Sequence, residues 1–212
     1  MKTNPKQQKR LIPDVITPNK ITVARICMIP LMILFFYLPF EGARITAAAI
    51  FALAAATDFL DGYIARKYNQ VSTMGKFLDP IADKVLVLAG FILLLSNTDF
   101  MTTYVWMDAV FGIFVCLIVA RELIVSGFRE IAAEKKVVLA AGMLGKIKTV
   151  AQDIAIFFLL FSIDFLYYIN YTAGTVFFII GFVIFCVAVL LTVVSGVEYI
   201  VTNKQVLKNS TK

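Results

Sequence analysis

Residues 165–197, FLYYINYTAGTVFFIIGFVIFCVAVLLTVVSGV, contain no charged side chain. A helix of roughly 20 apolar residues crosses the hydrocarbon core of a bilayer, and this run is longer than that. Over the whole chain 60% of the residues are hydrophobic and only 16% are charged, which is more apolar than soluble globular domains are. The sequence therefore predicts an all-α integral membrane protein rather than a soluble protein with a large core.

Other apolar runs extend this prediction to six transmembrane helices, at about 20–40, 43–66, 76–97, 106–128, 147–168 and 173–200. The charge-free cores 45–57 and 110–120 are too short to span alone, so we expect their charged flanks to continue as helix. The expected organisation is an N-terminal cytoplasmic or interfacial segment (1–19), one six-helix membrane domain (20–200) and a cytoplasmic tail (201–212).

The N-terminal segment pairs Leu11 with Val15 and Ile12 with Ile16 at helical spacing. This pattern predicts a short amphipathic segment that lies in the membrane interface. A cleaved signal peptide is the competing interpretation, but no small-residue cleavage site follows the first apolar run.

Lysine and arginine gather in alternate connections of the predicted bundle. They precede the first helix, separate helices 2 and 3 and helices 4 and 5, and follow helix 6, whereas Arg44 is the only cation in the opposite loops. By the positive-inside rule both termini are cytoplasmic, and we expect a multi-pass protein of the plasma membrane. The net charge of +6 follows from this topology and from contact with anionic lipid, and no basic soluble face for nucleic acid is visible.

Four aspartates interrupt the apolar pattern within residues 57–84, TDFLDGYIARKYNQVSTMGKFLDPIADK. On a helix Asp58 and Asp61 lie about 60° apart, and Asp79 and Asp83 lie about 40° apart. The short connection places both pairs at the cytoplasmic side, where four carboxylates would repel one another unless neutralised. Because hard oxygen ligands suit Mg²⁺ or Mn²⁺, we predict a site for two divalent cations.

Four further residues of this stretch fit a phosphate ligand. Gly62 and Ala65 are small and nearly one helical turn apart, and Gly75 leaves room before the next helix. Arg66 offers a guanidinium suited to phosphate. Any single aspartate here could be a helix cap, and Asp79 before Pro80 is a plausible one, but the whole pattern favours a diphosphate-binding metal site.

The spacing Asp58-x2-Asp61-Gly62-x2-Ala65-Arg66-x8-Gly75-x3-Asp79-x3-Asp83 matches every fixed position of a long signature, so the chain resembles the CDP-alcohol phosphatidyltransferase family. The resemblance implies a six-helix membrane enzyme, usually a homodimer, that works at the cytoplasmic surface with two divalent ions. It also implies that all four aspartates ligate metal and that Asp83 is the general base. The residues that contact the CDP part of CDP-diacylglycerol would be Asp61, Gly62, Ala65, Arg66 and Gly75.

Two other stretches resemble the bacterial phosphatidylglycerophosphate synthases of this family: TPNKITVARICMIPLMI (17–33) and ARELIVSGFREIAAEKKVVLAAGMLGKIKTVAQD (120–153). The acceptor would then be sn-glycerol 3-phosphate, a dianion whose pocket needs cations. Candidates are Arg121, Lys146, Lys148, Lys135 and Arg25, although the positive-inside topology alone would place basic residues near these helix ends. Asn19 and Thr22 are candidates for the CDP side.

Three alternatives remain open. A sibling enzyme with another acceptor, such as inositol phosphate, serine or phosphatidylglycerol, would share the whole signature. A membrane prenyltransferase also binds a lipid diphosphate through aspartates, but it would need a second, distant aspartate cluster. A divalent-cation transporter would place acids near the middle of the membrane, whereas these lie at helix ends.

Overall fold

The computed structural model describes residues 18–68, 73–97, 105–134 and 142–203. Within these ranges it describes all side chains except those of 18–20, 58–68, 73–77, 79–80, 105–107 and 134. The predicted interfacial segment up to residue 17 and the tail from residue 204 lie outside the described residues.

Helices account for nearly all of the described chain. They are α1 (Pro18–Tyr37), α2 (Ala43–Tyr68), α3 (Thr73–Ser96), α4 (Val105–Glu134), α5 (Met143–Asp164), a π-helix (Phe165–Ile169) and α6 (Tyr171–Thr202). No strand occurs in these ranges, and the predicted all-α class is confirmed. Each predicted helix has a counterpart, and α4 continues to Glu134, beyond its predicted end at residue 128.

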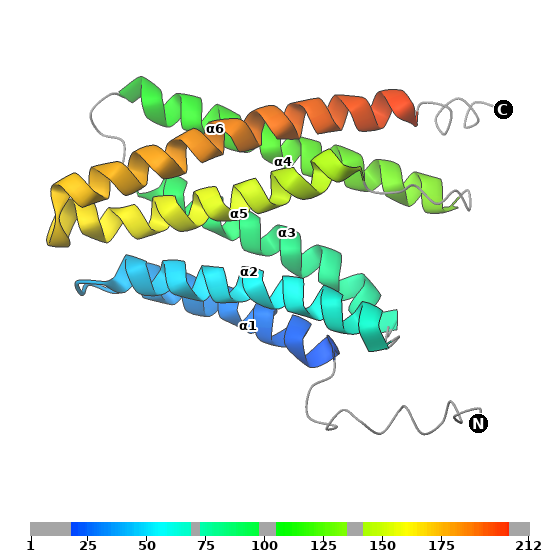
Figure 1. Ribbon diagram of the computed structural model, residues 1–212, viewed down its shortest axis with the longest axis horizontal. Coiled ribbons are helices and arrows are strands. Elements are labelled where there is room, and N and C mark those ends of the chain that lie inside the picture. The colour runs from blue at the N-terminus through cyan, green and yellow to red at the C-terminus, as the bar shows by residue number, and fades with distance from the viewer. Residues whose placement is uncertain (1–17, 69–72, 98–104, 135–141, 204–212) are drawn as a thin grey trace.

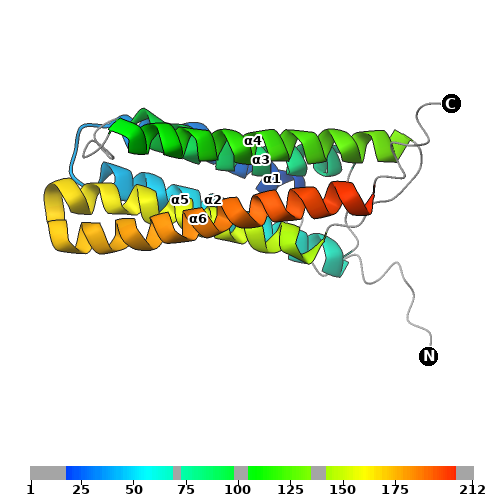
Figure 2. The same cartoon turned by 90° about the horizontal axis from the view of Figure 1, so that it is seen from above.

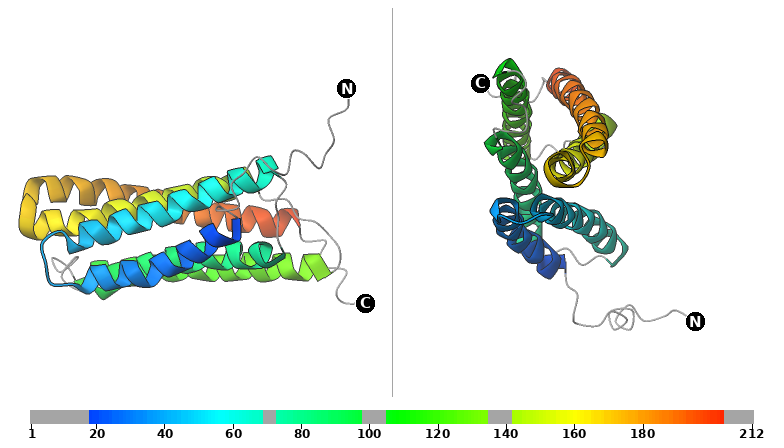
Figure 3. Two further views of the ribbon diagram at one scale, coloured as in Figure 1. Left: turned by 90° about the horizontal axis from the view of Figure 1, so that it is seen from below. Right: turned by 90° about the vertical axis from the view of Figure 1, so that its left-hand side faces the viewer.

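The helices alternate in direction and form one elongated bundle (Figure 1). Helices α2, α4 and α6 end at the same end of the bundle at which α1, α3 and α5 begin, and Figure 2 shows the same arrangement. We call this the active end. Helix α5 packs along α6 and α1 packs along α2, while α3 contacts α1, α2, α4 and α5. Viewed along the bundle, α3 lies between α4 and the α1–α2 pair (Figure 3).

At the opposite end, a side chain of α5 caps the first turn of α2. The connection between α1 and α2 is short and turns at Gly42, whose φ of 88° is accessible to glycine without strain. Asp164, fully buried at the end of α5, accepts hydrogen bonds on Oδ2 from the backbone N–H groups of Arg44 (2.8 Å) and Ile45 (3.0 Å). These are amides that a helix leaves unsatisfied within itself. The cap therefore joins α5 to α2.

The charge-free run 165–197 is not one continuous helix. Its first residues form the π-helix, and Asn170 then caps α6 by accepting a hydrogen bond from the N–H of Ala173 (3.1 Å). Gly174 lies so close to the preceding segment that a Cβ there would approach the backbone nitrogen of Leu166 to 2.5 Å. The run therefore contains the hairpin between α5 and α6.

The centre of the bundle is apolar, and so is much of its outer surface. Phe185 of α6 meets Phe111 of α4 with ring centroids 4.6 Å apart and Phe91 of α3 at 5.6 Å. On the outside, Leu123 and Leu190 are more than 60% exposed, which suits contact with lipid. The fold thus buries aromatic rings inside and presents aliphatic side chains outward.

In the part of the chain that the structure describes, three helical stretches are long and apolar enough to cross a membrane: Asp108–Ala133, Met143–Ile169 and Tyr171–Thr202. Two shorter apolar stretches, Ile21–Tyr37 and Ala43–Thr57, accompany them within the described ranges. The chain is therefore a multi-pass membrane protein, and the count of six spans stays a prediction.

Candidate active site

The four signature aspartates lie on two neighbouring helices at the active end. Asp58 and Asp61 are in the last turns of α2, and Asp79 and Asp83 are in the first half of α3. The two helices contact each other, and the end of α2 lies beside the start of α3 (Figure 1). The side chains of Asp58, Asp61 and Asp79 lie outside the described residues, so the convergence of the four carboxylates stays a prediction.

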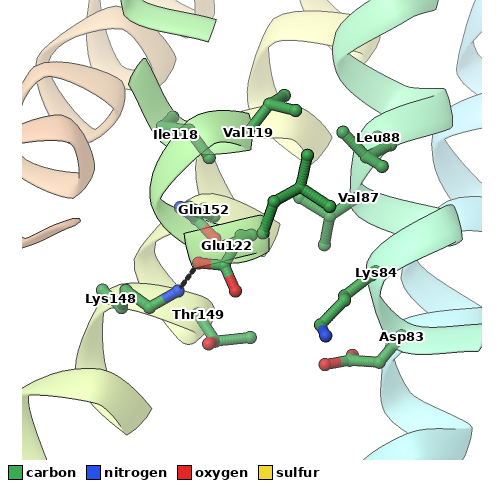
Figure 4. A pocket seen from close by; sticks show the side chains of 11 residues that line it. Asp83, Lys84, Val87, Leu88, Ile118, Val119, Glu122, Lys148, Thr149 and Gln152 are labelled. Carbon is green, nitrogen blue, oxygen red and sulfur yellow. Dashed lines mark hydrogen bonds and ion pairs between the residues drawn. The ribbon is translucent and has the colours of Figure 1, made fainter. Parts of the chain in front are cut away.

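Asp83 lines a cavity between α3, α4 and α5 (Figure 4). The floor of the cavity is apolar, and its polar side chains are two acids, two lysines, a threonine and a glutamine: Asp83, Glu122, Lys84, Lys148, Thr149 and Gln152. We call this the reaction cavity. It offers a carboxylate, which can accept a proton, beside ammonium groups, which can hold an anion.

Glu122 joins two of the predicted acceptor-binding cations. Its Oε1 accepts hydrogen bonds from Nζ of Lys148 and from Nη1 of Arg121, the latter at 3.2 Å. Lys148 is only 3% exposed, and a buried ammonium group requires an anion close by. Glu122 therefore stabilises Lys148 in the charged form within the cavity wall.

Lys84 faces the same cavity from α3 (Figure 4). Its ammonium group donates to Oγ of Ser126 on α4, and that hydroxyl in turn donates to the backbone carbonyl of Glu122 at 2.6 Å. The sequence pattern predicts a role for neither Lys84 nor Glu122, although each directly follows a predicted site residue. Their partners, Ser126 and Lys148, lie on other helices.

Arg121 is held between α4 and α6. Its Nη2 donates to Oγ of Ser195 at 3.1 Å, while Nη1 contacts Glu122. A Cβ at Gly196 would lie 2.9 Å from Cγ of Arg121, so this glycine leaves the space that the arginine stem occupies. The buried Nε makes no hydrogen bond with the part of the chain that is described. The guanidinium thus links Glu122, which lines the reaction cavity, to Ser195 of α6.

The other predicted site residues are distributed as follows. Lys146 is exposed and does not line the reaction cavity. It lies two residues before Lys148, and residues two apart point to different faces of a helix. Thr22 and Arg25 are fully buried on α1 and do not line the reaction cavity either. Lys135 lies outside the described residues. For Asn19, Gly62, Ala65, Arg66 and Gly75 the structure describes only the helical backbone.

The donor set of the signature fits a hard divalent cation, because all four side chains offer carboxylate oxygens. Among the residues whose side chains are described, no three histidine, cysteine, aspartate or glutamate side chains gather into a metal site. Asp83 is the one signature aspartate in that set, and its carboxylate faces the reaction cavity near the start of α3. The position of Asp83 is therefore compatible with a shared metal site at the ends of α2 and α3.

Comparison with known proteins gives one consistent result. Residues 15–194 match the CDP-alcohol phosphatidyltransferase family. Several similar proteins carry the name CDP-diacylglycerol–glycerol-3-phosphate 3-phosphatidyltransferase. The protein from Bacillus subtilis (strain 168) is 41% identical, over 91% of this chain and 97% of its own length. That from Rickettsia typhi is 42% identical, over 86% and 93%, and that from Salmonella choleraesuis is 36% identical, over 86% and 92%.

Proposed function

The chain belongs to the CDP-alcohol phosphatidyltransferase family, and we propose that it transfers the phosphatidyl group of CDP-diacylglycerol to sn-glycerol 3-phosphate. The products are phosphatidylglycerol phosphate and CMP. The names of its relatives support this acceptor. The structural observation that carries the proposal is the reaction cavity, in which the carboxylate of Asp83 lies near Lys148 and its neighbours.

Two divalent cations, Mg²⁺ or Mn²⁺, would be held by Asp58, Asp61, Asp79 and Asp83. When bound, they supply positive charge that stabilises the diphosphate and the charge that develops as CMP departs. On the CDP side, Arg66 binds a diphosphate oxygen, and Gly62, Ala65 and Gly75 let the nucleotide approach the backbone. Asn19 and Thr22 complete this side.

Asp83 accepts the proton of the 1-hydroxyl group of glycerol 3-phosphate. The oxygen then forms a bond to the phosphorus that bears diacylglycerol, and the bond from that phosphorus to the CMP oxygen breaks. A carboxylate in this role must lie within hydrogen-bond reach of the hydroxyl. The presence of Asp83 in the lining of the reaction cavity supports this role.

The phosphate of the acceptor binds Arg121 and Lys148. Both cations already meet at one oxygen of Glu122, so a dianion placed beside that carboxylate would contact both. Lys146, Lys135 and Arg25 are the remaining candidates; Lys146 and Arg25 do not line the reaction cavity, so they would act only by adding positive charge to the region around it. Charge-assisted hydrogen bonds of this kind are stronger than neutral ones.

The membrane arrangement follows from the alternation of the helices. All six helices span the plasma membrane, and the active end with both termini faces the cytoplasm. Support comes from the lysines and arginines, which gather in the segments at the active end. At the opposite end Arg44 is paired with Asp164 at 3.7 Å. The protein works as a homodimer, as the family resemblance implies.

An acceptor panel tests this function. Purified enzyme is incubated with CDP-diacylglycerol and, separately, glycerol 3-phosphate, inositol phosphate, serine or phosphatidylglycerol, and CMP release is measured. We expect release with glycerol 3-phosphate at least tenfold above that with any other alcohol, together with phosphatidylglycerol phosphate as the lipid product. Preference for another alcohol would assign the chain to a sibling reaction.

A further inference from the structure

Gln152 of α5 lines the reaction cavity about one helical turn further from the active end than Lys148 does. It is only 2% exposed, and no step of the proposed reaction uses it. A buried amide group costs free energy unless its donor and acceptor ends are hydrogen-bonded. The partners of the two ends therefore decide what this residue can do.

The nitrogen end of the amide is held by α6. Nε2 of Gln152 donates to Oγ1 of Thr192 at 3.1 Å, and that hydroxyl donates to the backbone carbonyl of Ala188 at 2.6 Å. A hydroxyl has a single hydrogen, so Thr192 can only accept from Gln152. The amide therefore cannot be turned end for end without losing this bond.

The oxygen end of the amide is left on the side of the reaction cavity. The described residues that line this cavity belong to α3, α4 and α5, whereas the partner of the nitrogen belongs to α6. Because the two ends of an amide diverge, a nitrogen directed at α6 leaves Oε1 facing the cavity (Figure 4). A carbonyl oxygen of this kind can accept two hydrogen bonds.

The acceptor oxygens in the reaction cavity differ in charge. Asp83 and Glu122 are carboxylates, and Glu122 already accepts from Lys148 and Arg121. A further carboxylate would repel a phosphate dianion, whereas the amide oxygen of Gln152 accepts a hydrogen without adding negative charge. It is therefore suited to a hydroxyl group of an anionic substrate.

The acceptor of the proposed reaction brings two hydroxyl groups into the cavity. The 1-hydroxyl attacks and gives its proton to Asp83, while the 2-hydroxyl takes no part in bond formation. Both lose their hydrogen bonds to water on binding, so the 2-hydroxyl also needs an acceptor in the protein.

We propose that Gln152 is a specificity residue for this substrate: its Oε1 accepts a hydrogen bond from the 2-hydroxyl group of glycerol 3-phosphate. Thr192 is a positioning residue that holds the amide in the required orientation. The site selects phosphorylated alcohols that carry a second hydroxyl beside the attacking one, because any other acceptor leaves a buried oxygen without a hydrogen bond. The proposal rests on the proposed function, since it concerns the acceptor of that reaction.

An analogue without the 2-hydroxyl tests the proposal. 3-Hydroxypropyl phosphate keeps the phosphate and the primary hydroxyl of glycerol 3-phosphate. With CDP-diacylglycerol saturating, kcat/KM is measured for each acceptor by CMP release, and their ratio is the preference. We expect the wild type to prefer glycerol 3-phosphate roughly ten- to a hundredfold. In Gln152→Met, which keeps the length of the side chain without the amide oxygen, the preference should nearly disappear.

Three further variants separate recognition from damage. The preference is a ratio measured on one enzyme sample, so partial misfolding does not change it. Thr192→Val keeps the shape but frees the amide, so the preference should fall in part even if Gln152→Met folds poorly. Gln152→Glu keeps an acceptor oxygen and should keep the preference, while its charge lowers kcat/KM for both phosphates. Ser162→Ala changes another buried polar residue of α5, about 15 Å further along the helix, and should match the wild type.

Two results would overturn the role of Gln152: a wild-type enzyme that uses both acceptors equally well, or a Gln152→Met variant that keeps the wild-type preference. The second includes an equal loss with both acceptors, which would mean that Gln152 only packs. Either result leaves the proposed function intact, because the wild type would still make phosphatidylglycerol phosphate from glycerol 3-phosphate. If the wild type makes none, the proposed function fails, and the role of Gln152 fails with it.

Discussion

The ammonium group of Lys148 on α5 donates a hydrogen bond to Oε1 of Glu122 on α4, and both residues line the reaction cavity (Figure 4). The same oxygen accepts a hydrogen bond from Arg121. One carboxylate therefore orients both cations that are proposed to bind the acceptor phosphate. The geometry of the acceptor pocket should therefore depend on Glu122. Its carboxylate would repel a phosphate dianion, so it acts by orienting the two cations.

We expect Glu122→Ala to raise the KM for glycerol 3-phosphate about tenfold, a cost of about 1.4 kcal/mol, because the buried Lys148 loses its ionic partner. The KM for CDP-diacylglycerol should change much less. Glu122→Asp should recover part of the loss because it keeps the charge. Glu130→Ala, an exposed glutamate of the same helix, is the matched control. Equal increases in both KM values would show a general structural role instead.

Arg121→Ala should raise the KM for glycerol 3-phosphate more than that for CDP-diacylglycerol, since the guanidinium is proposed to contact only the acceptor phosphate. Arg121→Lys should be intermediate, because it keeps the charge but loses the fork that reaches Ser195 and Glu122 together. Steady-state kinetics with each substrate varied in turn measures the ranking. The reverse ranking would remove Arg121 from the acceptor pocket.

Gly196→Ala tests the position of Arg121 without changing any charge. The added Cβ would lie 2.9 Å from Cγ of the arginine, so the stem must shift. We expect a several-fold rise in the KM for glycerol 3-phosphate. Gly127→Ala is the matched control, because a Cβ there meets nothing within 4 Å. Identical kinetics for the two variants would mean that Arg121 tolerates displacement.

Asp164→Ala should destabilise the fold without changing the chemistry. The variant loses the cap of α2, and the first-turn amides of Arg44 and Ile45 lose their acceptor. The expected cost is about 2 kcal/mol. Thermal unfolding in detergent micelles should show a lower Tm, while kcat well below that temperature stays unchanged. Asp108→Asn, an exposed acid of α4, is the control, and an equal Tm for both variants would contradict the role of the cap.

Hydropathy predicted the helices well because charges and polar residues flank most of the apolar runs. It also placed the break between α5 and α6 correctly, between residues 168 and 173, but it did not predict the π-helix or the cap at Asn170. The run 165–197 carries no charge through the π-helix and the turn at Asn170, so only Asn170 and Gly174 marked the break. A cap and a close contact are local packing features, and hydropathy does not detect them.

The candidate site was only partly predictable for a related reason. The spacing of the signature predicted a role for Asp83. Arg121 and Lys148 were predicted because a phosphate dianion needs cations in its pocket. Glu122 and Lys84 were missed because their roles depend on partners from other helices, Lys148 and Ser126. Helical periodicity could have separated Lys146 from Lys148, since residues two apart face different directions.

The most direct test compares purified wild-type enzyme with Asp83→Asn, using CDP-diacylglycerol and glycerol 3-phosphate and measuring CMP together with phosphatidylglycerol phosphate. Asparagine keeps the shape of the side chain but cannot accept the proton of the acceptor hydroxyl. We expect the wild type to form both products in equal amounts and the variant, at an unchanged Tm, to form neither. Near-normal turnover by Asp83→Asn would contradict the assignment of this carboxylate, and with it the reaction cavity, to phosphatidyl transfer.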